Sequence, residues 1–462
     1  MLTQDANRDS RLSFWARVRE FAVPPSMIET ATARRQVGDW AGACAAAGVD
    51  VDLGPRSVAR THGRELASRI RDDLRHLAPD LLRWHLPRIA PRGLLRPGLT
   101  ITLARYDTEG PGGVRPVRLV VRTPPAWADA GQRIGLALWD GSDSGPEARR
   151  HPHHRPNPRF RLDLHRHLWD ARRADELRIR SGAAAPPSSD DRPAMPPGAV
   201  PSGRSCAVGR WADEAGILLR AEGRAAGTVV VRFGARHRLL LDLVPEGDGP
   251  GPPVLRIAAA DGGVSALPVL PDAATWVLPD LDLLRTGSIE AGRLHPLVLA
   301  ALVPDHVAVA PARPPDPVGQ PRLVDCRGAR HRIGLVDGVL APLDHDPAEI
   351  RREELLVALT GTPLPCLQAI DEAHRRPDCL TGVRERLDHG DIAGALAVVE
   401  GLLGPGALLR SGELRDELEA AARRRITYGL FRAGLAEGPD RLHPYRRRPR
   451  DRRSHPRHAV RR

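Results

Sequence analysis

The residues best suited to hold a metal ion gather between positions 151 and 167. The candidate ligands are His151, His153, His154, Asp163 and His167. Neutral imidazoles and carboxylates are good ligands for zinc and similar ions. However, the first three histidines lie in a proline-broken stretch that is typical of a solvated loop. In the helix that we expect over 163–181, His165 points away from His167, and only Asp163 shares a face with His167. The pattern therefore favours a surface loop followed by the start of a helix. A metal-dependent hydrolase that uses these residues is a less favoured hypothesis.

The chain lacks the amine that several enzyme classes need. All 69 basic residues are Arg, and no Lys occurs. P-loop phosphate binding, kinase phosphate anchoring and Schiff-base catalysis each depend on a Lys amine. The dinucleotide-binding, zincin and hydrolase motifs are absent too, since Gly141-Ser-Asp-Ser-Gly145 has Asp where the nucleophilic Ser would stand. We therefore assign no catalytic residue, expect no cofactor, and lean towards a protein that is not an enzyme.

The five cysteines are scattered and odd in number. They are Cys44, Cys206, Cys326, Cys366 and Cys379. This spacing predicts no disulfide framework and no Cys-x-x-Cys metal site. We interpret Cys326 and Cys366 as buried structural thiols, because nothing nearby in the sequence indicates a lowered thiol pKa. No stretch reaches the length of an apolar membrane span or signal segment, so we expect a cytoplasmic protein without a membrane partner.

Positive charge is concentrated at the carboxyl end. The net charge of the whole chain is +12. Residues 441–462 contribute most of it, because they hold ten Arg and only one acidic residue, Asp451. The candidate polyanion-binding residues are Arg446, Arg447, Arg448, Arg450, Arg452 and Arg453. A cluster of this kind can condense onto nucleic acid or another polyanion. The use of Arg alone, with abundant Ala, Gly and Pro, is typical of a high-GC bacterial genome, so the Arg content is partly a codon effect.

Hydrophobic periodicity predicts an α+β, multidomain chain. A helical N-terminal region is expected over 1–92, followed by a β-rich segment with one helix (93–182), a Pro/Ser/Ala-rich linker (183–204), an antiparallel β-rich domain (205–345), a helical domain (346–436) and a disordered basic tail (437–462). The helical stretch 56–77 has one apolar face. Strands are expected near 99–105, 117–122, 134–139, 215–220, 228–233, 237–244, 254–259, 330–336 and 339–343. Asp346-Pro347 should begin the C-terminal helices, the last of which should span 413–435.

One phrase occurs twice, near opposite ends of the chain. Residues 38–45 and 390–397 share Gly-Asp-x-Ala-Gly-Ala-x-Ala. Gly would end one helix in a left-handed turn, and Asp would cap the next helix. The phrase is similar to the turn and second helix of tetratricopeptide-type hairpins, which often serve protein binding, but the chain has no regular repeat of that kind. We predict two ordinary helical hairpins.

These observations lead to one main functional hypothesis and one alternative beside the hydrolase. The main hypothesis is a protein-interaction or adaptor protein of a multi-component bacterial system, whose partner is another protein. The alternative is nucleic-acid or polyanion binding through the Arg-rich tail.

Overall fold

The computed structural model describes residues 2–110, 113–129, 132–141, 151–184, 204–234, 237–244, 254–259, 266–306, 322–326, 328–336, 339–360, 364–375, 380–404, 406 and 408–435. It confirms the α+β class, with antiparallel sheets between helical regions. Within these ranges, no helix is both long enough and apolar enough to cross a membrane.

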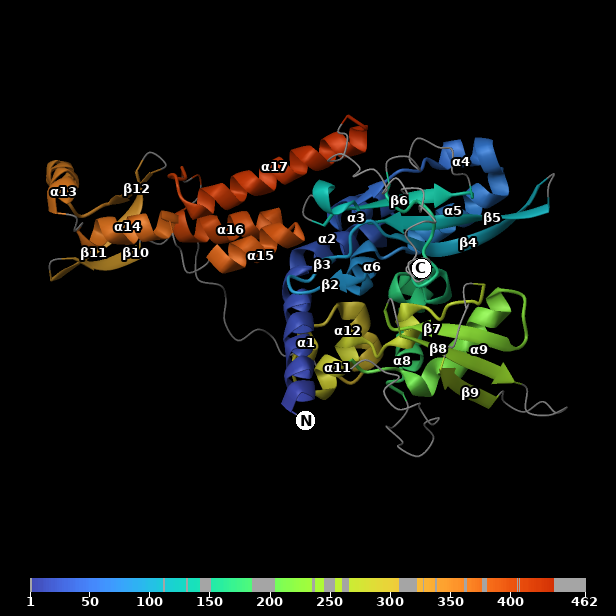
Figure 1. Cartoon of the computed structure of the whole chain (residues 1–462). Coiled ribbons are helices and arrows are strands. Elements are labelled where there is room, and N and C mark those ends of the chain that lie inside the picture. Colours follow the sequence, from blue (N-terminus) through green and yellow to red (C-terminus); the bar gives the residue numbers. More distant parts are fainter. Residues whose placement is uncertain are drawn as a thin grey trace, which may run out of the picture.

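A four-stranded sheet and the helices packed on it form the N-terminal body (Figure 1). The helices are α1 (Leu2–Phe21), α2 (Pro25–Gln36), α3 (Trp40–Ala46), α4 (Pro55–His62), α5 (Arg64–His76) and α6 (Pro79–His85). The strands are β1 (Val49–Val51), β4 (Thr100–Gly110), β5 (Gly113–Arg122) and β6 (Ile134–Trp139), with the short pair β2 (Arg88–Ile89) and β3 (Leu94–Leu95) beside them. The order is β1-β6-β5-β4, with β1 parallel to β6 and the other pairs antiparallel. Ile101, Val121 and Leu136 lie side by side across three strands and are fully buried.

One hydrophobic core extends across the predicted boundary at residue 92. It joins Val18 of α1 and Ile70 of α5 to Ile101 of β4. It also includes Val298 of α12 (Pro296–Leu302), so the chain returns to the N-terminal body long after leaving it. The helical and β-rich segments up to residue 182 therefore share one core.

A three-stranded meander forms the second unit. Its strands are β7 (Gly227–Arg232), β8 (Arg238–Val244) and β9 (Val254–Ala259), each antiparallel to the next. The helix α9 (Trp211–Ala221) lies on this sheet and buries Trp211 and Leu218 against Leu241. The short helices α10 (Asp272–Thr275) and α11 (Pro279–Arg285) then lead back to α12.

The C-terminal unit projects away from the other two (Figure 1). Its strands are β10 (Arg322–Cys326), β11 (Ala329–Val336) and β12 (Val339–Pro342), in that order in an antiparallel sheet. Its helices are α13 (Pro347–Thr360), α14 (Pro365–Arg375), α15 (Leu380–His389), α16 (Ile392–Leu403) and α17 (Glu413–Ala433). Ile333 of β11 shares a core with Ile370 of α14 and Leu414 of α17. Asp346 accepts a hydrogen bond from the backbone N–H of Ala348, which confirms the predicted start of α13.

The repeated phrase forms two capped hairpins, as predicted. Gly38 and Gly390 have φ values of 78° and 87°. Asp39 accepts a hydrogen bond from the N–H of Gly42 at 2.8 Å, and Asp391 accepts one from the N–H of Gly394 at 2.9 Å. The pairs α2–α3 and α15–α16 thus use the same local chemistry in separate parts of the fold.

The C-terminal unit is attached to the N-terminal body at two places. Near α1, Arg17 forms an ion pair with Glu385, and Arg83 donates a hydrogen bond to the backbone oxygen of His389. At the free edge of the sheet, the hydroxyl of Tyr428 on α17 donates to Asp50 of β1 at 2.5 Å. One turn further on, Arg432 pairs with Asp52, and Phe431 contacts Trp127 edge to face.

Two predicted elements are wrong. The segment 163–181 contains short 3-10 turns and α8 (Leu177–Arg180) instead of one helix. Its buried residues follow no helical period, because consecutive positions 167–170 are all covered. The expected strand 215–220 lies in α9, where Trp211, Ala215 and Leu218 share a helix face. The stretch 56–77 is helical as predicted, although Gly63, with a φ of 91°, divides it into α4 and α5.

Most of the other predicted elements can be compared with the described residues. Strands β4, β5, β6, β7, β8, β9, β11 and β12 confirm the expected runs, whereas β1, β2, β3 and β10 were not expected. The final helix is confirmed as α17, on which Ile426 and Leu430 are exposed. Positions 185–203 of the predicted linker and all of the predicted tail (437–462) lie outside the described residues.

Candidate functional site

A cavity of about 220 Å³ lies where the N-terminal body meets the second unit. One wall comes from α1 and from the segment between α6 and β2. The opposite wall comes from the chain around α8 and from the segment that carries α10. We call this space the arginine cavity. Its arginines are Arg11, Arg19, Arg88, Arg96, Arg159, Arg161, Arg180, Arg204 and Arg210.

Five of these nine arginines are balanced by carboxylates. Arg19 and Arg159 form two-pronged pairs with Asp280 and Asp272 at 2.7–2.9 Å. The other pairs are Arg161 with Asp163 and Glu222, and Arg180 and Arg210 with Glu214. These ion pairs hold the walls of the cavity together. Some join segments that are distant in sequence, and the others join residues within one turn of the chain.

Four arginines of the cavity have no such partner. In the described parts of the chain, no carboxylate lies within ion-pair distance of Arg11, Arg88, Arg96 or Arg204. Arg88 reaches only backbone oxygens, that of Arg83 at 2.8 Å and that of Gly93 at 3.4 Å, and its Nε has no hydrogen-bond partner. The cavity therefore carries an excess of four positive charges.

The surroundings make these charges unfavourable as they stand. Burial lowers the pKa of Arg88 well below its usual value, and Arg83 and Arg19 lower it further. Burial also lowers the pKa of Arg204 to about 9, with Arg11 adding to the effect. The pKa of Arg11 is lowered by burial as well. Asp282 raises the pKa of Arg11 and Asp272 raises that of Arg204, which offsets part of this effect, and an anion beside the arginines would favour their charged forms further.

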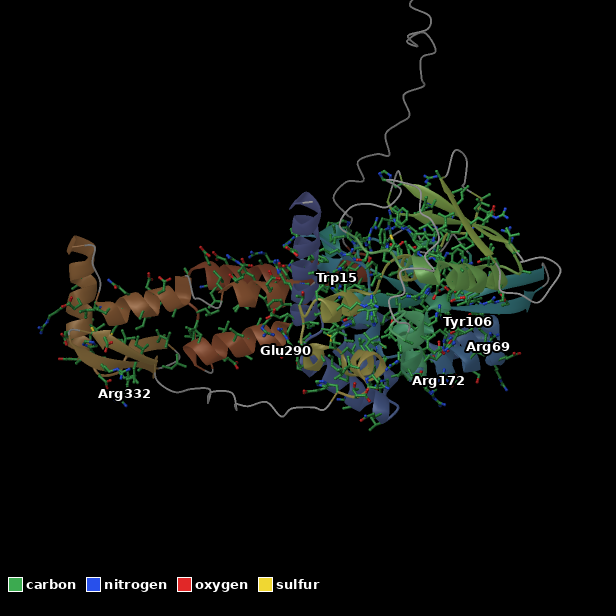
Figure 2. All side chains as sticks on the ribbon, turned by 90° about the horizontal axis from the view of Figure 1, so that it is seen from below. Trp15, Arg69, Tyr106, Arg172, Glu290 and Arg332 are labelled. Carbon is green, nitrogen blue, oxygen red and sulfur yellow. The ribbon has the colours of Figure 1, made fainter. Side chains whose placement is uncertain are left out.

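Aromatic rings and free ring nitrogens complete the lining. Trp15 projects from α1 and lies among the packed side chains near the centre of the molecule (Figure 2). The guanidinium of Arg204 lies over the indole of Trp276, 3.5 Å from the ring centre, and the buried Nε1 of Trp276 has no partner. His85 and His167 also line the space, and each has one buried ring nitrogen without a partner. Burial lowers the pKa of His85 to about 3 and lowers that of His167, so both rings are neutral near pH 7.

This arrangement suits anion binding better than bond breaking. Guanidinium groups present planar sets of N–H donors that match phosphate and carboxylate oxygens. The lining holds one carboxylate, Asp272, which Arg159 occupies, and one hydroxyl, Ser181, which donates to the backbone oxygen of Arg178. Within the described lining, a nucleophile paired with a base is missing.

The histidine candidates from the sequence are dispersed rather than clustered. His151 is buried and its Nε2 contacts the backbone oxygen of Thr123 at 2.9 Å. The backbone oxygen of His153 accepts a hydrogen bond from Thr100, and the backbone N–H of His153 donates to His151. Asp163 pairs with Arg161, and His167 lies in the arginine cavity. His154 lies beside His153 and joins no cluster. Within the described ranges, these residues do not form a set of converging metal ligands.

The structure instead brings together Cys326, His345 and Cys366 in the C-terminal unit. Their separations in sequence follow no common zinc motif, so spacing alone could not reveal the group. The arginines of the cavity were missed for a related reason. Arg is so frequent in this chain that four scattered positions carry no signal until the fold brings them together. The polyanion candidates Arg446, Arg447, Arg448, Arg450, Arg452 and Arg453 lie outside the described residues.

Comparison of the chain with protein-family models, with curated proteins and with solved structures found no match.

Proposed function

We propose that this protein binds a phosphorylated small molecule in the arginine cavity and is not itself an enzyme. The observation that carries the proposal is the set of four cavity-lining arginines without a carboxylate partner. Arg11 and Arg88 are half-buried, and Arg96 and Arg204 are exposed. Four like charges that line one cavity repel one another, and a bound anion would offset this repulsion.

The number of donors favours phosphate over a single carboxylate. Each guanidinium offers five N–H donors, and a phosphate group offers three strong acceptor oxygens with nearly two negative charges. One carboxylate would leave most of the excess charge uncompensated. Arg11 and Arg204 lie near each other, since Arg11 lowers the pKa of Arg204, and we expect a phosphate or diphosphate group to contact both.

The rest of the lining indicates what else the ligand contains. Trp15, Trp276 and Phe160 line the cavity together with aliphatic side chains such as Ile101 and Leu278. Aromatic and aliphatic walls bury an apolar or planar group, while the free N–H of Trp276 can fix its orientation. We therefore expect an organic phosphate with an apolar or aromatic part, which fits better than inorganic phosphate alone.

The position of the cavity indicates how ligand binding would affect the stability of the protein. Its walls belong to two units with separate cores, and Arg159 with Asp272 already joins them. A ligand that contacts both walls would stabilise their arrangement, because binding to the folded state alone raises stability by RT ln(1 + [L]/Kd). At a ligand concentration of about 100 times Kd, the gain is about 2.7 kcal/mol.

A ligand screen by thermal unfolding and tryptophan fluorescence tests the proposal. The probes are pyrophosphate, AMP and inorganic phosphate, with adenosine as the uncharged counterpart of AMP. Pyrophosphate or AMP should raise the Tm of the full chain and alter tryptophan emission, and adenosine should do neither. Arg204→Met should abolish the response while leaving the ligand-free protein folded, since the side chain is exposed and forms no ion pair within the described residues.

The matched control removes a positive charge elsewhere. Arg71 on α5 is exposed, and Arg71→Met changes the net charge by the same amount. This variant should respond to the probes as the wild type does. A response that Arg204→Met leaves intact, or that Arg71→Met removes equally, would show that the anions bind the general surface and would contradict the proposal.

The adaptor hypothesis and the tail hypothesis stay predictions. An adaptor should retain a protein partner after nuclease treatment, with or without residues 441–462. Polyanion binding through the tail should disappear when those residues are deleted and should weaken steeply with salt.

A further inference from the structure

We infer that the C-terminal unit contains a structural Zn²⁺ site formed by Cys326, His331, His345 and Cys366. The first observation is the convergence of three ligand groups. The ligand atoms of Cys326, His345 and Cys366 all lie within 4.8 Å of one another, and both cysteines are fully buried. In a tetrahedral zinc site, Zn–S bonds of about 2.3 Å and Zn–N bonds of about 2.0–2.1 Å place ligand atoms roughly 3.3–3.8 Å apart. Movements of about 1 Å or less would complete this geometry.

The second observation concerns unpartnered nitrogens of two histidines. The Nε2 of His345 and the Nδ1 of His331 are both buried and have no hydrogen-bond partner. The two rings lie against each other, with centres 4.1 Å apart. A buried polar atom without a partner costs about 1–3 kcal/mol, so two of them beside two thiols require an explanation that apolar packing does not supply.

The register of the sheet explains why His331 belongs to the group. Cys326 pairs with Ala329 across the β10–β11 ladder, and Val324 pairs with His331. Side chains alternate between faces along a strand, so Cys326, Val324, Ala329 and His331 share one face. That face packs on α14, whose first turn carries Cys366. His331 lies on this face with its ring against that of His345, and we place it in the fourth position.

The surroundings of His345 have the form of a supporting contact to a metal ligand. Its Nδ1 lies 3.6 Å from a carboxylate oxygen of Glu349, one helical turn along the chain. Ligating histidines commonly direct one ring nitrogen at a carboxylate, which orients the other nitrogen towards the metal. The contact leaves Nε2 as the ligand atom, in agreement with its lack of a partner.

The small core at this end of the unit accounts for the need for such a site. The local cluster of fully buried apolar groups contains Cys326, Leu364 and Cys366, with Val324, Ile350 and Leu367 partly buried around it. Small units with little apolar burial are commonly stabilised by a metal ion. Four nitrogen and sulfur ligands with no exposed position are typical of a structural zinc site rather than a catalytic one. The site is also remote from the arginine cavity, since Figure 2 shows Arg332, next to His331, at the far end of the projecting unit from Trp15.

Metal analysis of the full chain tests the inference. Protein purified without chelators should contain one zinc per chain. After chelation and dialysis, Co²⁺ should bind with the same stoichiometry and give the visible bands of tetrahedral Co²⁺ together with near-ultraviolet thiolate-to-cobalt charge transfer. The Co²⁺ titration uses the unaltered sequence, so it decides the question even where a cysteine variant fails to fold.

Variants separate the ligands from their neighbours. Cys366→Ser should abolish stoichiometric binding, His331→Ala should weaken it, and Glu349→Gln should weaken zinc affinity by about 10–100-fold. Cys44→Ser is the matched control, because Cys44 is equally buried but lies in the N-terminal core. Metal-free protein that takes up no Co²⁺, a disulfide between Cys326 and Cys366, or full binding by Cys366→Ser would overturn the inference. Full binding by His331→Ala would overturn the place of His331 in it.

Discussion

The ion pair between Arg19 and Asp280 provides a quantitative test of how α1 is held in place. The carboxylate of Asp280 accepts hydrogen bonds from Nε and Nη2 of Arg19 at 2.8 and 2.7 Å and from Nε1 of Trp84 at 3.0 Å. The side chains of Arg19 and Asp280 are only 2% and 0% exposed. Asp280→Asn keeps the shape but removes the negative charge, which leaves the Arg19 guanidinium buried without compensation.

The expected loss is about 3–5 kcal/mol, the usual cost of breaking a buried pair from one side. Because each 1.4 kcal/mol is a factor of ten, hydrogen exchange in α1 and α11 should accelerate by a factor of about 100 to a few thousand at pH 7. A chain with several cores has no single unfolding free energy. Hydrogen exchange measured by mass spectrometry suits this chain, because it reports on each helix separately.

The pH dependence follows from the pKa of Asp280. Burial would raise this pKa, but Arg19 outweighs that effect and holds it below its ordinary value. The pair therefore stabilises the fold fully above the unfolded pKa of about 3.9, and its contribution is lost as the pH falls through the folded pKa. The difference between the variant and the wild type should shrink in that range.

The control for Asp280→Asn is Glu176→Gln, which breaks the solvent-exposed pair with Arg173. Exposed pairs contribute about 0–1 kcal/mol, so exchange should change by less than about fivefold. Acceleration of α1 by less than tenfold in Asp280→Asn, or equal acceleration in the two variants, would refute the argument that burial makes this pair strong.

Two further predictions concern local backbone chemistry and a buried histidine. Gly38→Ala should destabilise the fold by about 1–2 kcal/mol, because the φ of Gly38 is 78° and therefore left-handed. Gly382→Ala lies inside α15, where the added Cβ meets nothing within 4 Å, and should stabilise the fold by about 0.5–1 kcal/mol. Denaturant unfolding that gives both changes the same sign would contradict this prediction. Burial, with Arg88 and Arg83 adding to it, lowers the pKa of His389 to about 3, so this ring should cost about 1.4 kcal/mol of stability per pH unit as the pH falls from about 6.5 towards 3. His389→Asn should flatten that dependence in unfolding measured between pH 7 and 4, and an unchanged slope would show that the ring is not held neutral.

Local chemistry in the sequence was enough to predict the two helical hairpins. Gly38 and Asp39, like Gly390 and Asp391, act within one turn of the chain, so neither tertiary packing nor distant partners can alter their roles. The hairpin β11–β12 and the meander β7–β9 were predictable for a similar reason, because each strand pairs with the next strand along the chain.

Elements whose form depends on distant contacts could not be predicted in this way. The Ile217-Leu218-Leu219 run fits a strand as well as a helix, and the burial of Trp211 against β8 decides for a helix. The segment 163–181 is covered on several sides by α6, α12 and β4, so no single apolar face develops. The strand β1 has only three residues and is paired in parallel with β6, more than 80 residues later.

The sites were less predictable than the elements. The unpaired arginines come from α1, from β2, from the loop before β4 and from the last position of the expected linker. The absence of Lys removed standard phosphate-binding motifs from consideration, but guanidinium groups can bind phosphate without any of them. Cys326 and Cys366 were correctly expected to be buried, whereas their proximity to His345 depends on how β12 and α14 pack.

The attachment of α17 to β1 has a consequence for the order in which the protein can be completed during synthesis. Asp50 and Asp52 emerge from the ribosome early, but their partners Tyr428 and Arg432 follow about 380 residues later. Domains fold as they emerge, and contacts of such long sequence separation form slowly because a large loop must close. Until then Asp50 and Asp52, at the outer edge of the sheet, lack these partners, and unprotected sheet edges can pair with other chains. A nascent or truncated chain that ends before α17 should therefore depend on chaperones in a way that the full-length protein does not.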